Sequence, residues 1–325
     1  MKKLSIFTFL GVLILTGGFR AVSAWQGTQT QAPQEGSPTP DQSAQPLASK
    51  ENDEAIEILR SAQDRLFQRE SVRATISQRV SLGDYKFAST GRYVSGAGFR
   101  SRLEYRVELG DLQGTFLEVC DGQILHTRRV VEQIGAGSLA ATSVLETQLS
   151  RRDIEKILRE ARNHLDVPKA VQAAEIGIGG LPAVLASIER SMILDAVREE
   201  TVDGASYDVV QGRWDPARQE SLLGGLGAFA GQIGQFLPDL VRVYFNRETQ
   251  FPERFIYLKL ASEERQTYRP ILKVEFTDIQ LDQPIGVGEF SYIAPPGAEE
   301  VDETMSFIQM IQQFADEQKN TAPVD

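Results

Sequence analysis

The sequence has few of the residues on which enzymes and metal sites most often depend. Among 325 residues there is one cysteine, Cys120, and there are two histidines, His126 and His164. A single cysteine cannot form an internal disulfide. His126 falls at the end of a predicted hairpin strand and His164 at the end of a predicted helix, so we interpret both as structural or surface residues. The fold must therefore be held together by its hydrophobic core.

Catalytic and cofactor motifs are also missing. The sequence has no G-x-S-x-G elbow, H-E-x-x-H pair, P-loop or EF-hand loop. Residues 225–230 fit the pattern G-x-G-x-x-A, but neither a preceding buried strand nor a βαβ context supports a dinucleotide site. We interpret the acid-rich run 299–303 as solvated surface and helix N-terminal charge rather than as a calcium site. We therefore predict a protein that is not an enzyme and has no catalytic residue, cofactor or metal.

Long hydrophobic runs are absent except for Leu4–Leu15. This run follows Lys2 and Lys3 and precedes the small residues of 22–24, which is the pattern of a secretory signal peptide cleaved after Ala24. The run is too short to span a bilayer comfortably, and no cysteine near the cleavage point can carry a lipid anchor. We predict that residues 1–24 are a signal peptide, that the mature protein has no integral membrane span, and that it is periplasmic or secreted.

Acidic residues outnumber basic residues, 45 to 34, and the formal net charge is −11. The predicted signal peptide contains basic but no acidic residues, so its removal makes the chain more acidic. Such a surface repels nucleic acid and anionic headgroups, and nucleic-acid binding is therefore not expected.

Residues 25–50 are rich in Gln, Pro, Ser and Thr and poor in apolar residues. They cannot bury enough surface to offset the entropy of ordering, so a disordered linker is predicted. This linker is either a functional spacer or an idle connection. We expect one domain at residues 51–318, followed by a flexible tail at 319–325.

Regular alternation of apolar and charged residues marks Phe99–Leu109. Its odd positions are apolar apart from Ser101, and its even positions are all charged. Successive side chains of a strand point to opposite faces, so this pattern predicts an antiparallel strand with one buried and one solvated face. Asp121-Gly122 is a strong hairpin signal. Further strands are expected at Val72–Val80, Tyr85–Tyr93, Thr115–Cys120, Gln123–Arg128, Ala196–Val202, Ala205–Arg213, Leu240–Phe245, Glu253–Leu260 and Ile271–Gln280.

Helical spacing of apolar residues occurs in four stretches. Ala55, Leu59, Ala62 and Leu66 form the stripe of an amphipathic helix that starts near Asn52 or Asp53. Further helices are expected at Ser150–Leu165, with Ser150 as the N-cap, around Pro182 as a first-turn residue, and at Glu303–Gln318. The middle two would form a helical insertion at about 132–195.

The stretch Leu222–Pro238 has no charged residue and many glycines. Two interpretations remain open for it. It is either a movable lid or interaction loop, or an ordinary buried connection. In the first case, Leu226, Phe229, Ile233 and Phe236 would form the cover.

The order of these elements resembles the LolA/LolB-like superfamily, the periplasmic lipoprotein carriers and their relatives. The resemblance rests on V-R-A-T-I-S-Q-R-V (72–80), L-E-V-C-D-G-Q-I-L (117–125) and F-P-E-R-F-I-Y (251–257). It rests most specifically on V-E-F-T-D-I-Q-L-D-Q-P-I (274–285) and F-S-Y-I-A-P-P-G-A-E-E-V-D-E-T (290–304). It implies an α+β fold, a strongly curved antiparallel half-barrel whose concave face is covered by helices and accepts acyl chains.

We therefore expect an exported carrier or chaperone, of the lipoprotein-sorting type, that binds a lipid acyl chain or a lipidated protein in an apolar cavity. The alternative is a periplasmic sensor or protein-interaction domain of the same fold, which would bind an envelope protein. The expected cavity wall consists of Ile76, Tyr85, Phe87, Tyr93, Phe99, Leu103 and Tyr105.

Overall fold

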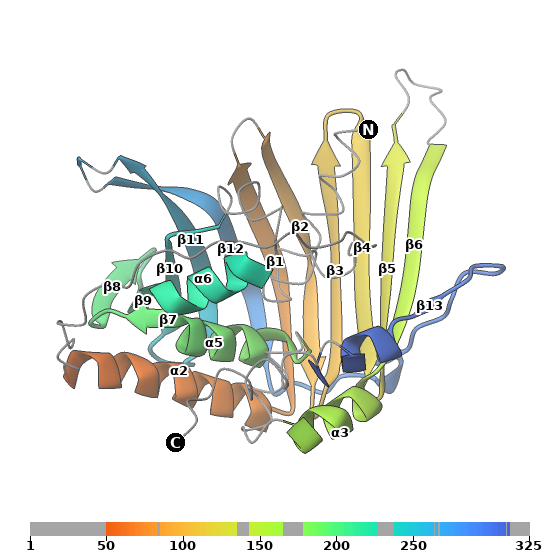
Figure 1. The fold of residues 1–325 in the computed structure, drawn as a ribbon, viewed down its shortest axis with the longest axis horizontal. Helices are drawn as coiled ribbons and strands as arrows, with labels where there is room; N and C mark the ends of the chain where they lie inside the picture. Colours follow the sequence, from red (N-terminus) through yellow and green to blue (C-terminus); the bar gives the residue numbers. More distant parts are fainter. Residues whose placement is uncertain are drawn as a thin grey trace, which may run out of the picture.

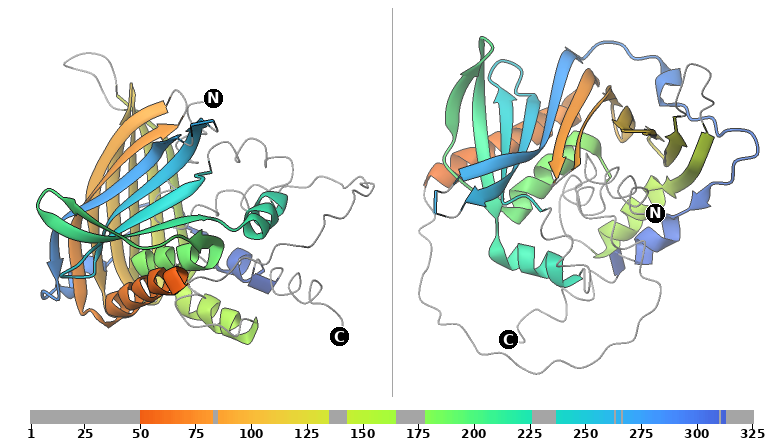
Figure 2. Two further views of the ribbon diagram at one scale, coloured as in Figure 1. Left: turned by 90° about the vertical axis from the view of Figure 1, so that its left-hand side faces the viewer. Right: turned by 90° about the horizontal axis from the view of Figure 1, so that it is seen from above.

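The computed structural model describes residues 50–82, 85–134, 143–164, 178–225, 237–262, 264–265, 267–309 and 311–312. They form one curved sheet with helices on its concave side (Figures 1 and 2). The sheet has 13 strands in the order β13-β6-β5-β4-β3-β2-β1-β12-β11-β10-β9-β7, with β8 paired to β9. Its two ends do not meet, so the sheet is a half-barrel. The α+β half-barrel predicted from the sequence is confirmed.

The strands pair antiparallel, apart from the short parallel pair of β13 with β6. They are β1 (Ser71–Leu82), β2 (Tyr85–Gly96), β3 (Arg100–Leu109), β4 (Leu112–Asp121), β5 (Ile124–Gln133), β6 (Ser143–Asp153), β7 (Met192–Leu194), β8 (Arg198–Val202), β9 (Ala205–Trp214), β10 (Leu240–Asn246), β11 (Pro252–Ser262), β12 (Thr267–Leu281) and β13 (Val301–Asp302).

The alternating pattern of β3 sets the two faces of the sheet. Leu103, Tyr105 and Val107 are buried on the concave, inner face, whereas Arg106 and Glu108 are exposed on the convex, outer face. The expected buried and solvated faces of this strand are therefore confirmed.

The register between strands extends the inner face to both sides of β3. Tyr105 lies opposite Gly91 of β2 and Phe116 of β4, and Gly91 lies opposite Ile76 of β1. A Cβ atom on Gly91 would lie 1.9 Å from the carbonyl oxygen of Glu104. Only glycine fits there, because β2 and β3 approach too closely for any side chain at this position.

Two helices fill the inner face on one half of the sheet. α2 (Lys50–Gln68) buries Ala55, Leu59 and Ala62, as its predicted stripe requires. α5 (Gly180–Ser191) packs beside it and buries Leu181, Leu185 and Ile188. Both helices share a core cluster with the inner residues of β1 and of β9–β12 (Figure 1), such as Val243, Phe255, Leu272 and Phe276.

The helix predicted at Ser150–Leu165 begins later than expected. Residues 143–153 form β6, the edge strand, so the predicted N-cap Ser150 lies within a strand. The helix α3 (Ile154–His164) begins after Asp153, whose Oδ1 accepts a hydrogen bond from the Lys156 amide at 2.8 Å. The interval predicted as a helical insertion therefore contains a long strand, which the sequence does not mark because β6 has no regular apolar alternation.

Residues 283–303, the C-terminal strap, cross the outer face of the sheet. Phe290 of the short helix η3 (Val287–Phe290) is buried against Gly96, and Glu289 pairs with Arg92 at 2.5 Å. Tyr292 stacks on His126, with ring centroids 4.4 Å apart. The strap then pairs with the β6 edge as β13, and Ile308 and Ile311 beyond it pack with α3. It therefore passes from the outer face round this edge to the inner side.

The remaining predicted elements agree with the structure in part. α6 (Pro216–Gly225) is a helix that includes the start of the glycine-rich stretch, whereas residues 226–236 lie outside the described part of the chain. Residues 304–309 are helical, as predicted for the final helix, and residues 313–318 lie outside the described residues.

Candidate functional site on the inner face

Large apolar side chains form a row across the inner face of β2–β4. Phe87, Tyr93, Leu103, Tyr105 and Phe116 are all at most 9% exposed and belong to one core cluster. The rings of Tyr105 and Phe116 stack, with centroids 4.9 Å apart. We call these five residues the apolar row.

Of the seven residues predicted to line a cavity, five are brought together. Ile76, Phe87, Tyr93, Leu103 and Tyr105 share the large core cluster, in which Ile76 is also packed among the residues of α2 and α5. Phe116, a neighbour in the register, was missed although its strand was predicted.

The two other predicted lining residues do not join this group. Phe99 packs against a different cluster, which contains Cys120, Leu125 and the buried residues of α3. The side chain of Tyr85 lies outside the described part of the structure. The predicted cover residues Leu226, Phe229, Ile233 and Phe236 also fall outside it.

Beyond the apolar row, the inner face becomes polar. The register places Glu118 of β4, Arg129 of β5 and Arg152 of β6 on the same face as Tyr105 and Phe116. Sequence reasoning missed these residues. The signal was present, because consecutive arginines in a strand point to opposite faces, so either Arg128 or Arg129 had to face inward.

Burial shapes the electrostatics of this inner face. The pKa of Arg129 is lowered by burial, which disfavours its charged form, while the nearby Tyr105 and Glu118 act in the opposite direction. Burial likewise raises the pKa of Tyr105, so that its hydroxyl stays protonated at any physiological pH. The guanidinium carbon of Arg129 lies 5.7 Å from the centroid of the Phe116 ring, within cation–π range.

Cys120 is packed inside the protein and His126 contacts the strap. Cys120 is buried, and burial raises the pKa of its thiol to about 12, which leaves almost no reactive thiolate. His126 lies on the outer face, where its Nδ1 is 2.9 Å from Glu300 of the strap. The side chain of His164 lies outside the described residues. Within the described residues, no group of three or more His, Cys, Asp or Glu side chains is placed to hold a metal.

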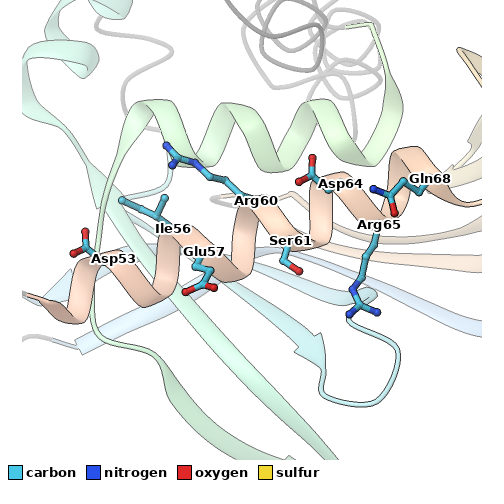
Figure 3. A pocket seen from close by; sticks show the side chains of 8 residues that line it. All are labelled: Asp53, Ile56, Glu57, Arg60, Ser61, Asp64, Arg65 and Gln68. Carbon is cyan, nitrogen blue, oxygen red and sulfur yellow. The ribbon is translucent and has the colours of Figure 1, made fainter.

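A hollow of about 570 Å³ lies elsewhere, along α2 (Figure 3). Ile56 is the one apolar residue among the described side chains that line it, and the others are charged or polar. One of them, Arg60, forms an ion pair with Glu189 of α5 at 2.7 Å. This hollow does not have the apolar lining that an acyl chain needs.

The described part of the chain also contains no helix that is long and apolar enough to cross a membrane.

Comparisons with known proteins give likenesses of fold. No protein-family model matches the chain, and a search of curated proteins finds no match. The lipoprotein LppX of Mycobacterium tuberculosis is 12% identical over 73% of this chain and 99% of that one, with a TM-score of 0.35. MucB in complex with MucA(peri) is 12% identical over 77% of this chain and 66% of that one, with a TM-score of 0.30. A LolA superfamily protein of Nitrosomonas europaea is 11% identical over 73% of this chain and 97% of that one, with a TM-score of 0.25.

Proposed function

We propose that this protein is an exported, non-enzymatic carrier or chaperone that binds an acyl chain, of a lipid or of a lipidated protein, on the inner face of its half-barrel. The observation that carries the proposal is the apolar row. It continues from strand to strand across β2, β3 and β4, where Tyr93 lies opposite Leu103 and Tyr105 lies opposite Phe116. An acyl chain lying across these strands would contact these two pairs, whereas Phe87 lies farther along β2.

The energetics of such a site need no special chemistry. Burying one methylene contributes about 0.8 kcal/mol, so a chain of about 14 carbons gains on the order of 10 kcal/mol before ordering costs. Ordering the chain and displacing whatever covers the row offset much of this gain. The resulting moderate affinity is the condition under which a carrier can both bind and release its cargo.

The inner residues of both halves are buried in one core cluster, and α2 and α5 lie mainly over β1 and β9–β12 (Figure 1). Over β1 and β9–β12, the side chains of α2 and α5 complete the core, with Leu59, Leu181 and Leu185 fully buried. A ligand there would have to displace two helices. We therefore place the acyl site over β2–β4.

The test is native mass spectrometry of the exported protein, followed by solvent extraction. The expected result is an adduct with the mass of a lipid or lipidated peptide, recovered in the extract. A bare polypeptide mass and an empty extract would refute the proposal. A stable protein partner with no bound lipid would instead favour a sensor or interaction domain of the same fold.

A pair of variants on β3 locates the site. Leu103→Gln introduces a polar group into the apolar row, and Arg106→Gln makes the same replacement on the exposed outer face of the same strand. We expect Leu103→Gln to lose most of the bound lipid and Arg106→Gln to retain it, with circular dichroism confirming that both are folded. Equal retention by both folded variants would show that the row does not line the site.

A further inference from the structure

Arg129, at the end of the apolar row, is a half-buried cation with which no carboxylate among the described residues forms an ion pair. Its Nε atom is shielded from solvent and makes no hydrogen bond. Arg152, the next arginine along the same face, is different, since its Nη2 lies 2.5 Å from Oε2 of Glu303.

Shielding a guanidinium nitrogen from water without giving it a hydrogen-bond partner is unfavourable. A buried charge is ordinarily paired, because removal from water costs several kcal/mol per ion unless hydrogen bonds replace the lost hydration. The Phe116 ring at 5.7 Å offers one weak cation–π contact. Glu118 lies diagonally across the register, and its charge and that of Glu303 favour the protonated form of Arg129 without pairing with it directly. The shielded Nε–H of this arginine is therefore a donor that no described group uses.

From this geometry we propose that Arg129 binds the anionic headgroup of the ligand, a carboxylate or a phosphate, while the acyl chain lies along Phe116 and Tyr105. This assignment rests on the proposed function and adds a ligand class to it, the anionic amphiphiles. A guanidinium presents two parallel N–H donors to a carboxylate or phosphate. Such charge-assisted hydrogen bonds are stronger than bonds between neutral groups.

The position of Arg129 suits the shape of such a ligand. Phe116 of β4 lies directly opposite Arg129 of β5, and Tyr105 of β3 lies opposite Phe116. The guanidinium and the two aromatic rings are therefore neighbours on three adjacent strands. The other cation on this part of the inner face, Arg152, is held by Glu303 and lies with its guanidinium carbon 4.4 Å from the centroid of the Phe307 ring. Arg129 is thus the arginine of this face that is available for a headgroup.

The experiment measures displacement of a neutral naphthylamine dye from the full-length mature protein by four compounds. These are hexadecanoate, hexadecyl phosphate, hexadecanol and inorganic phosphate. We expect both anionic amphiphiles to bind about tenfold or more tightly than the alcohol, because only they can accept the charge-assisted bonds. Inorganic phosphate should not displace the dye, since it has no chain. The order of the two anions distinguishes a fatty-acid ligand from a phospholipid ligand.

Three variants assign the preference to its residue. Arg129→Met should bind the alcohol as the wild type does but lose the preference for anions, and Arg129→Lys should keep part of it. Arg106→Met, on the outer face, should behave as the wild type. Without ligand, Arg129→Met should unfold at the same or a higher temperature than the wild type, because the uncompensated charge is gone.

The outcomes separate the two proposals. If no amphiphile displaces the dye, both proposals are wrong. If the alcohol and the anions bind the wild type equally well, the acyl site stands and the headgroup assignment is wrong. A preference for anions that persists in Arg129→Met would also overturn the assignment.

Discussion

The two halves of the half-barrel use the same kind of strand but cover it differently. In the first half, β1 and β9–β12 have their inner residues packed against α2 and α5 in one continuous core. In the second half, β2–β6, the inner face changes from the apolar row to the polar group of Glu118, Arg129 and Arg152. Its outer face is crossed by the C-terminal strap.

This difference shows that an apolar face on a strand does not determine what covers it. Ile76 and Leu103 have the same position in the alternating pattern, and both are buried. Ile76 nevertheless lies in the half that the protein's own helices complete, whereas Leu103 lies in the half to which we assign the ligand. The comparison therefore predicts different responses of the two halves to mutation.

The largest expected effect is at the boundary between the halves. Gly91→Ala would place a methyl group 1.9 Å from the backbone oxygen of Glu104, and two paired strands cannot separate to admit it. We expect a loss of more than about 3 kcal/mol in the free energy of unfolding, or no folded protein. Gly286→Ala is the control, because nothing lies within 4 Å of that position. Equal urea midpoints for the two variants would show that β2 and β3 are free to separate here.

A smaller effect distinguishes the halves directly. Leu59→Ala, in α2, opens a cavity in the core that the helices complete, and should cost about 2–5 kcal/mol whether or not lipid is present. Leu103→Ala also removes buried contacts and should destabilise the delipidated protein, but it should in addition lose stabilisation by added ligand. Urea denaturation of both variants, with and without hexadecanoate, provides the measurement. If the ligand stabilises Leu103→Ala as much as Leu59→Ala, Leu103 does not line the site.

The smallest effect concerns the strap. Hydrogen bonds from the Thr304 hydroxyl and amide hold the pKa of Asp302 below its usual value, and Arg151 adds to this effect. A lowered folded pKa stabilises the protein above the unfolded value, about 3.9, and this stabilisation disappears as the pH falls through the folded value. Asp302→Asn should therefore lower the melting temperature slightly at pH 7, and the difference should shrink as the pH falls below the unfolded pKa.

A control variant shows whether this effect belongs to the strap. Glu108→Gln removes an exposed acid from the outer face of β3 and should change the melting temperature less at pH 7. A difference between Asp302→Asn and the wild type that persists at low pH would mean that the aspartate acts through its shape and not through its charge.

Sequence patterns located most strands and α2 because alternation and helical periodicity record which side of an element is buried. The alternation in β3 identified Leu103 and Tyr105 as buried residues of the inner face. It failed for β6, whose Glu146, Gln148 and Arg152 face inward at a polar edge, so the usual apolar period is absent. In the run 299–303, Glu299 and Asp302 are exposed and Glu303 precedes a helix, as predicted, but Glu300 also contacts His126 and Glu303 pairs with Arg152.

The strap and the residue after it contact three separate parts of the second half. Residues 290–304 contain Phe290, Tyr292 and Thr304, each of which contacts a different strand or helix end of the second half. Local sequence cannot reveal such contacts, because each is made with residues far away in the chain. The same limit applied to Arg129, whose lack of a partner became visible only when the neighbouring strands were in place.

The adjacency of β1 and β12 has a consequence for how the protein is made. Ile76 pairs with Phe276, so the middle of the sheet joins residues synthesised early to residues synthesised late. At 5–20 residues per second, the ribosome needs roughly 10–40 s to make the chain between them. During that interval one side of β1 has backbone donors and acceptors without their final partner, which is a template for aggregation. Shielding the nascent chain during this interval is therefore as much a requirement of this fold as the stability of the finished protein.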